Sequence, residues 1–224
     1  MVYYMYSKSI KIFIIIIMFM TFECYGQWSK STLINTPVCI GYNADQSNLV
    51  QNGSLGTYVV WLDSRIGHVY AQYVNAKGVA QWKTNGIFIC GQQGNQTAVH
   101  AINDGLGNFI ITWYNSRDTV FDFYAQKITP EGIICWPTGG IKFASSKATL
   151  STYNISSDSR GGVVIAYLSY IWPTYSPPYS LLVQRIDKNG SICWGNGKTI
   201  VDASYLQEAQ PVLIPDGLKG VVLA

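Results

Sequence analysis

The sequence predicts an all-β fold, a β-propeller built of four-stranded blades. One pattern of apolar, aromatic and turn residues recurs along the chain with a period of about 52–58 residues. Each copy contains four short apolar stretches separated by turn residues, and none of them shows helical periodicity. Four strands in a repeat of this length are typical of a propeller blade. A row of β-sandwich domains, each of which needs roughly 100 residues, is the weaker alternative.

Tryptophan marks the period. Trp82 follows Trp28 by 54 residues, and Trp136 follows Trp82 by another 54. Trp194 follows Trp136 by 58 residues. An apolar stretch comes after each of these tryptophans, and the strands expected there are 37–40, 86–90, 141–144 and 198–201.

Three further strands follow in each copy. The first of them ends in a turn such as Asn52-Gly53 or Asp104-Gly105, whose residues tolerate positive φ, and it is expected at 46–50, 96–102, 150–155 and 210–214. The next is the most apolar and is expected at 58–61, 109–113, 163–167 and 221–224, as a strand covered on both faces. The last is expected at 68–74, 121–128 and 181–186.

These strands predict the domain organisation. A signal peptide is expected at 1–26 and a partial propeller at 27–224. The predicted parts of the propeller are a terminal strand at 27–44, blades at 45–95, 96–149 and 150–208, and the start of another blade at 209–224. Because propellers have four to eight blades, we expect an incomplete propeller from a truncated sequence. In a longer chain the strand after Trp28 would close the ring.

The N-terminal segment predicts export. Lys8 and Lys11 precede the apolar run 12–20, which has the length of a signal-peptide core and is too short for an ordinary membrane span. Cleavage before Gln27 is expected, and an uncleaved anchor is the alternative. We therefore expect a secreted or outer cell-surface protein that meets the membrane only during export.

The repeats also resemble a known group of proteins. The residues that carry the resemblance are Trp61, Asp63, Arg65, Tyr70, Ala71, Gln72, Gly78, Trp82, Asn85 and Gly86. This order of residues resembles repeats in large bacterial secreted proteins, many of which carry a type IX secretion sorting domain and are described as propeller-like. The likeness extends from about Trp28 to Ala224. It implies a propeller fold and does not imply a particular activity.

Composition limits the partners. Charged residues make up 12% of the chain and the net charge is +3, and no Lys/Arg cluster suggests nucleic-acid binding. The mature chain would keep Cys39, Cys90, Cys135 and Cys193. Cys135 and Cys193 hold equivalent places in different units, too far apart for a disulfide. We expect free cysteines that are buried as small apolar residues.

Asp63 and Arg65 form the most suggestive polar pair, which Asn115 and Arg117 repeat. An acid and a guanidinium at a blade rim could bind a sugar or a carboxylate. Their recurrence in consecutive units favours a structural loop instead, because a catalytic residue is usually needed only once.

The third copy is interrupted by residues 169–180, an aromatic and proline-rich stretch that contains Trp172, Tyr175 and Tyr179. Aromatic side chains on a rigid loop suit the recognition of sugars or peptides. A hydrophobic loop that merely covers the rim is the alternative. If the protein has a function of its own, we expect it here, where the repeat fails.

Other recurring residues are expected to build the repeat. They are Trp28, Trp61, Trp82, Trp113, Trp136, Trp194, Gln72, Gln126 and Gln184. The glutamines should bond to backbone groups between blades, because a buried amide needs partners. The tryptophans at 82, 136 and 194 should pack between neighbouring blades.

No motif indicates catalysis, a cofactor or a metal. His68 and His100 are the only histidines and lack a neighbouring second ligand, and acidic turns such as Asn103-Asp104-Gly105 fit ordinary turn chemistry. We expect a non-catalytic binding or scaffold protein whose partner is a carbohydrate or a protein at the cell surface. The alternative is the propeller domain of a glycan-active enzyme, such as a glycoside hydrolase or a sialidase-like protein, with its catalytic residues outside this fragment.

Overall fold

The computed structural model describes residues 38–40, 44–53, 56–63, 66–90, 94–117, 120–146, 153–171, 176–203 and 210–224. Every regular element in these ranges is a β-strand. The first sheet contains β1 (Ala44–Gln51), β2 (Gly56–Asp63), β3 (His68–Asn75) and β4 (Ile87–Cys90). The second sheet contains β5 (Asn95–Asn103), β6 (Phe109–Arg117), β7 (Val120–Ile128) and β8 (Ile141–Ser146).

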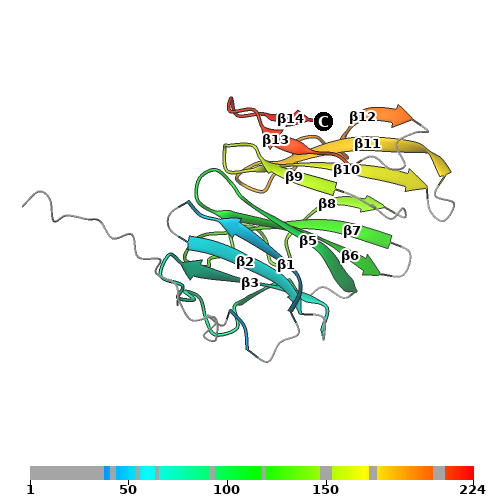
Figure 1. Cartoon of the computed structure of the whole chain (residues 1–224). Helices are drawn as coiled ribbons and strands as arrows, with labels where there is room; N and C mark the ends of the chain where they lie inside the picture. The colour runs from blue at the N-terminus through cyan, green and yellow to red at the C-terminus, as the bar shows by residue number, and fades with distance from the viewer. Residues whose placement is uncertain are drawn as a thin grey trace, which may run out of the picture. The chain divides into compact units, whose positions relative to one another are not determined.

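The third sheet contains β9 (Tyr153–Ser157), β10 (Val163–Ile171), β11 (Ser176–Ile186) and β12 (Lys198–Ala203). A pair of strands follows it, β13 (Leu213–Pro215) and β14 (Val221–Leu223). Strands that follow one another in the sequence are antiparallel neighbours in every sheet, as Figure 1 shows. The predicted all-β class, with four antiparallel strands in each unit, is confirmed.

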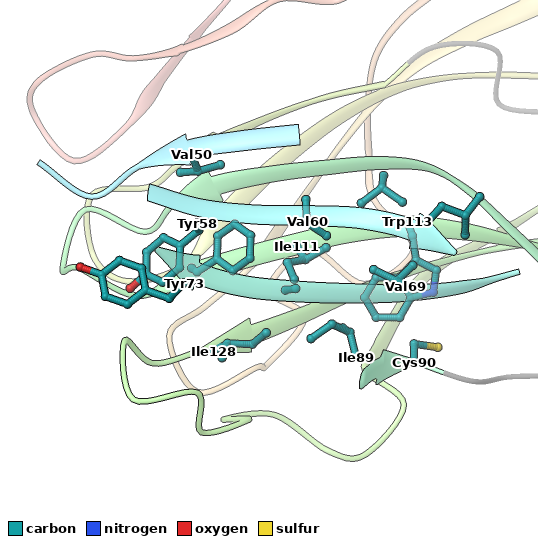
Figure 2. Close-up of a cluster of buried hydrophobic side chains, with 14 residues drawn as sticks. Val50, Tyr58, Val60, Val69, Tyr73, Ile89, Cys90, Ile111, Trp113 and Ile128 are labelled. Atoms are coloured by element: carbon teal, nitrogen blue, oxygen red, sulfur yellow. The ribbon is translucent and has the colours of Figure 1, made fainter. Parts of the chain in front are cut away.

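Apolar side chains fill the space between consecutive sheets. Between the first and second sheets, Tyr58 and Val69 lie in one buried cluster with Ile111 and Trp113 (Figure 2). The ring of Tyr58 stacks on Phe109 with centroids 4.7 Å apart. A second cluster joins the second and third sheets, and a third joins the third sheet to the β13–β14 pair. The central strands β6 and β10 are therefore covered on both faces, which explains their continuous apolar sequence.

A buried glutamine in the third strand of each sheet fixes the turn that follows. The Gln72 carbonyl oxygen accepts hydrogen bonds from the backbone N–H groups of Tyr73 and Trp82, both at 2.9 Å. Its amide nitrogen donates to the Lys83 carbonyl at 3.0 Å. The second and third sheets repeat this arrangement with Gln126 and Gln184. The amide is fully buried in all three sheets, and these bonds supply the partners that it needs.

The glutamine bonds correct one expectation. They reach the backbone as predicted, but they stay within one sheet instead of joining two. The contact between sheets comes from the next tryptophan. The Trp82 indole N–H donates to the Pro130 carbonyl at 2.9 Å, and the Trp136 indole N–H donates to the Lys188 carbonyl at 3.4 Å. Gly132 has a φ of 83°, and a Cβ there would lie 3.0 Å from Trp82.

Among the described cysteines, only Cys90 is buried, although the sequence predicts burial for all four. Cys39 is half-buried, whereas Cys135 and Cys193 are free thiols that are exposed. Each precedes a tryptophan whose backbone N–H bonds to the buried glutamine of the same sheet. Successive side chains of an extended chain point to opposite sides. The Cys135 thiol therefore faces outward, near the Ile133 carbonyl.

The glutamine contact predicts a loss of stability on substitution. Gln126→Ala leaves the Trp136 N–H and the Pro137 carbonyl without their partner, so we expect the free energy of unfolding to fall by about 2–4 kcal/mol. Urea denaturation followed by tryptophan fluorescence measures it. The control is Gln81→Ala, whose exposed side chain only donates to the Val79 carbonyl and should cost less than about 0.5 kcal/mol. Equal stability of the two variants would contradict the proposed role.

Candidate functional site

The connections between strands leave the sheets at two opposite edges, because neighbouring strands are antiparallel. The edge with the β1–β2 and β3–β4 turns and their equivalents is here called the turn edge. The opposite edge, called the loop edge, carries the β2–β3, β6–β7 and β10–β11 connections and the links between sheets. Of the binding residues predicted from the sequence, Asp63 and Arg117 lie at the loop edge, where β2 and β6 end.

Hydrogen bonds between and within the sheets occupy the polar groups of the turn edge. The Tyr58 hydroxyl donates to the Gly107 carbonyl of the second sheet at 3.0 Å. The Lys127 ammonium lies 2.7 Å from the Asp104 carboxylate and donates to the Gly161 carbonyl of the third sheet, also at 2.7 Å. This ion pair is buried. The turn edge is therefore a structural seam between sheets.

The acidic turns use their carboxylates locally. Asp158 accepts hydrogen bonds from the N–H groups of Arg160 and Gly162, both at 2.8 Å. The Arg185 guanidinium lies 2.7 Å from the same carboxylate. Burial alone would raise the pKa of Asp158, but these hydrogen bonds outweigh it and hold the pKa below its usual value. Ordinary turn chemistry thus explains these residues.

Asp63 lies at the loop edge, where β2 ends. Its side chain is fully buried, and its backbone carbonyl accepts hydrogen bonds from Ile66 at 3.2 Å and Gly67 at 2.8 Å. Asn115 is buried at the corresponding place in the second sheet. A Cβ at Gly94 would lie 2.6 Å from the Asn115 side-chain oxygen, so glycine is required there. Both side chains are therefore buried instead of open to a ligand.

The other predicted binding residues are placed only in part. Arg117 is the last residue of β6 and pairs with Val120. Tyr179 belongs to β11, where its backbone pairs with Ala203. Arg65, Trp172 and Tyr175 lie outside the described residues, as does Trp28.

Gln96 is a loop-edge residue that the sequence analysis did not single out. It is buried, and its side-chain oxygen accepts a hydrogen bond from the Val69 N–H of the first sheet at 3.1 Å. Its amide donates to the Cys90 sulfur at 3.5 Å. A signal was available, because Gln46, Gln96 and Gln210 each open a copy of the same predicted strand.

Two residues with shifted pKa values, Tyr153 and His100, lie in contact between the second and third sheets. The Tyr153 hydroxyl donates to the Ala98 carbonyl and accepts a hydrogen bond from the Thr112 hydroxyl at 3.2 Å. The His100 ring lies 4.4 Å from the Tyr153 ring. Burial raises the pKa of Tyr153 and lowers the pKa of His100. Packing between sheets is a sufficient cause of both shifts.

The side chain of Gln96, at the loop edge, forms hydrogen bonds to neighbouring strands. Within the described ranges, no three His, Cys, Asp or Glu side chains gather in a way that could hold a metal ion. The same ranges contain no helix of the length and apolarity that a membrane span requires. No protein-family model matches the sequence, and no curated protein matches it.

Asp158 predicts a pH dependence of stability. Because folding lowers its pKa, its contribution is present at neutral pH and is lost as the pH falls below about 4, through the lowered folded value. We expect Asp158→Asn to be less stable than the wild type at pH 7, with the difference shrinking towards pH 2. Urea midpoints across this pH range measure the difference.

The matched control is Asn52→Ala, at the corresponding uncharged position of the first sheet. Its side chain bonds to Tyr58 and Asn103, so its loss should cost stability by an amount that does not change over the same pH range. A difference between wild type and Asp158→Asn that stays constant down to pH 2 would contradict the assignment.

Proposed function

We propose that the chain forms part of a β-propeller and serves as a non-catalytic binding module of a secreted or cell-surface protein. Contacts between first strands support the propeller. β1 packs along β5, β5 along β9 and β9 along β13, whereas the fourth strands β4, β8 and β12 share no contact of that extent. Sheets that approach through their first strands and separate at their fourth strands fit blades arranged around an axis.

The proposal that the protein is exported is based on its N-terminal sequence. Lys8 and Lys11 followed by the apolar run 12–20 support a signal peptide, and the likeness of the repeats to those of large bacterial secreted proteins agrees with it. Lys8, Lys11 and the apolar run 12–20 lie outside the described part of the chain.

The β10–β11 hairpin is the observation that carries the binding proposal. β11 has eleven residues, two more than β7, whereas β10 and β6 have nine each. The hairpin is still paired within the inserted stretch, since Ser169 lies opposite Ser180 and Ile171 lies opposite Ser176. The inserted stretch therefore starts and ends in paired strands at the loop edge, a firmer base for a binding surface than an unpaired loop.

The prolines of this hairpin fit its register. Proline cannot donate a hydrogen bond to a ladder, so it is tolerated at irregularities and edges. Pro177 and Pro178 lie in the stretch where the register between β10 and β11 shifts, and they precede Tyr179, the first β11 residue that pairs with β12. The insertion is thus compatible with the sheet that carries it.

The proposed ligand is a carbohydrate. The four residues that join Ile171 to Ser176 include Trp172 and Tyr175, and flat aromatic faces with a polar group suit sugar rings. The recurrent polar residues, by contrast, are held by the sheets, as Asp104, Asp158 and the three glutamines show. Recognition is therefore assigned to the one unit that departs from the repeat.

A glycan array probed with the purified protein tests this function. We expect binding to at least one glycan class, weakened about tenfold or more in Trp172→Ala and Tyr175→Ala. The control is Ile133→Ala, an exposed apolar residue of a turn between β7 and β8, which should leave binding unchanged. Binding that survives both aromatic substitutions would contradict the assignment to the hairpin. Conversion of a bound glycan would support the glycan-active enzyme instead.

A further inference from the structure

The central strands of the first two sheets each bury a tryptophan whose indole N–H is unsatisfied. Trp61 in β2 and Trp113 in β6 are almost completely removed from solvent, and neither indole N–H has a hydrogen-bond partner among the described residues. Trp61 pairs with Tyr70, and Trp113 pairs with Tyr124, so the two tryptophans hold the same place in their sheets. A buried donor without a partner costs free energy. Its recurrence at equivalent places indicates a common cause.

A second polar atom on the same face of the first sheet is in the same situation. Asp63 follows Trp61 by two residues in β2, so their side chains point to the same face, and His68 lies directly opposite Asp63 in β3. The His68 Nδ1 atom is buried and has no hydrogen-bond partner in the described part of the chain. The buried Asp63 carboxylate is therefore the neighbour of both residues in this strand pair.

The second sheet repeats this arrangement with other side chains. Asn115 follows Trp113 by two residues and is buried, and Asp122 lies directly opposite Asn115. A Cβ at Gly94 would lie 2.6 Å from the Asn115 side-chain oxygen, so the glycine keeps the space beside this oxygen open. An oxygen-bearing side chain thus neighbours the indole in both sheets.

The chemistry of these groups selects the ligand. The indole N–H needs a hydrogen-bond acceptor, which a metal cation cannot supply. The Asp63 carboxylate disfavours an anion, because like charges repel, and its oxygens need a donor. A water molecule is both acceptor and donor. A buried water makes about three hydrogen bonds to polar groups that would otherwise be unsatisfied.

We propose that residues 61–63 and their counterparts 113–115 each bind one internal water molecule. In the first sheet the water accepts a hydrogen bond from the Trp61 indole and donates one to the Asp63 carboxylate, with His68 Nδ1 as its third neighbour. In the second sheet it accepts from the Trp113 indole and donates to the Asn115 side-chain oxygen. The two sites belong to the interior of the sheets, so they do not depend on the proposed glycan.

Water–protein cross-relaxation in protein labelled with ¹⁵N-tryptophan tests the proposal, with rotating-frame spectra to separate cross-relaxation from proton exchange. In the wild type we expect the indole protons of Trp61 and Trp113 each to contact a long-lived water. Asp63→Leu removes the acceptor, so the Trp61 contact should be lost while the Trp113 contact stays. Asp63→Asn introduces the side-chain type found at position 115 and should keep both contacts.

The indole of Trp82 is the internal control, because its N–H donates to the Pro130 carbonyl and should contact no long-lived water. In Asp63→Leu the Trp113 contact also reports that the fold is intact, and Asn115→Leu should give the reciprocal result.

The wild-type spectrum decides the proposal even if a leucine variant does not fold. Absence of a long-lived water from either Trp61 or Trp113 overturns it. A crystal structure in which either indole N–H donates directly to a protein oxygen overturns it too, as does a Trp61 contact that survives in folded Asp63→Leu.

Discussion

A buried glutamine in the third strand of each sheet is the contact on which the rest of the structure depends. The Gln72 side chain accepts hydrogen bonds from two backbone N–H groups and donates one to a carbonyl of the following turn. These bonds fix the position of the turn relative to the strand. In that position the Trp82 side chain reaches the next sheet, where its indole N–H donates a hydrogen bond to the Pro130 carbonyl. A bond within one unit thereby sets the spacing between units.

The junctions between sheets repeat the same packing. At each junction that the structure describes, opposite faces of two consecutive sheets meet through buried apolar side chains. Each sheet then contacts only its neighbours, and the polar bonds at the turn edge, such as that of Lys127 to Gly161, strengthen the same junctions. A repeat of this kind distributes stability over similar interfaces. A function specific to this protein is then expected in the unit that departs from the pattern.

The strands could be predicted from the sequence because apolar stretches and turn residues recur together, and β1 to β14 lie close to the expected ranges. The partners of the glutamines could not, since they depend on which backbone groups the β3–β4 turn brings back to Gln72. The exposure of Cys135 was missed because composition does not tell which side of an extended segment faces outward. The full burial of Asp63 was not predicted either, because a carboxylate at the end of a strand can face the core or the solvent. The residues of the candidate site were predictable only as an interruption of the repeat.

Backbone hydrogen exchange in Gln72→Ala, followed by NMR, tests most directly whether the glutamine of one unit holds that unit to the next. In the wild type the amides of Tyr73 and Trp82 should exchange slowly, because both bond to the Gln72 side chain. We expect the variant to lose protection at Trp82 and, in the second sheet, around Gly132, while the third sheet keeps its protection. Unchanged protection at Trp82, or a loss confined to the first sheet, would contradict it.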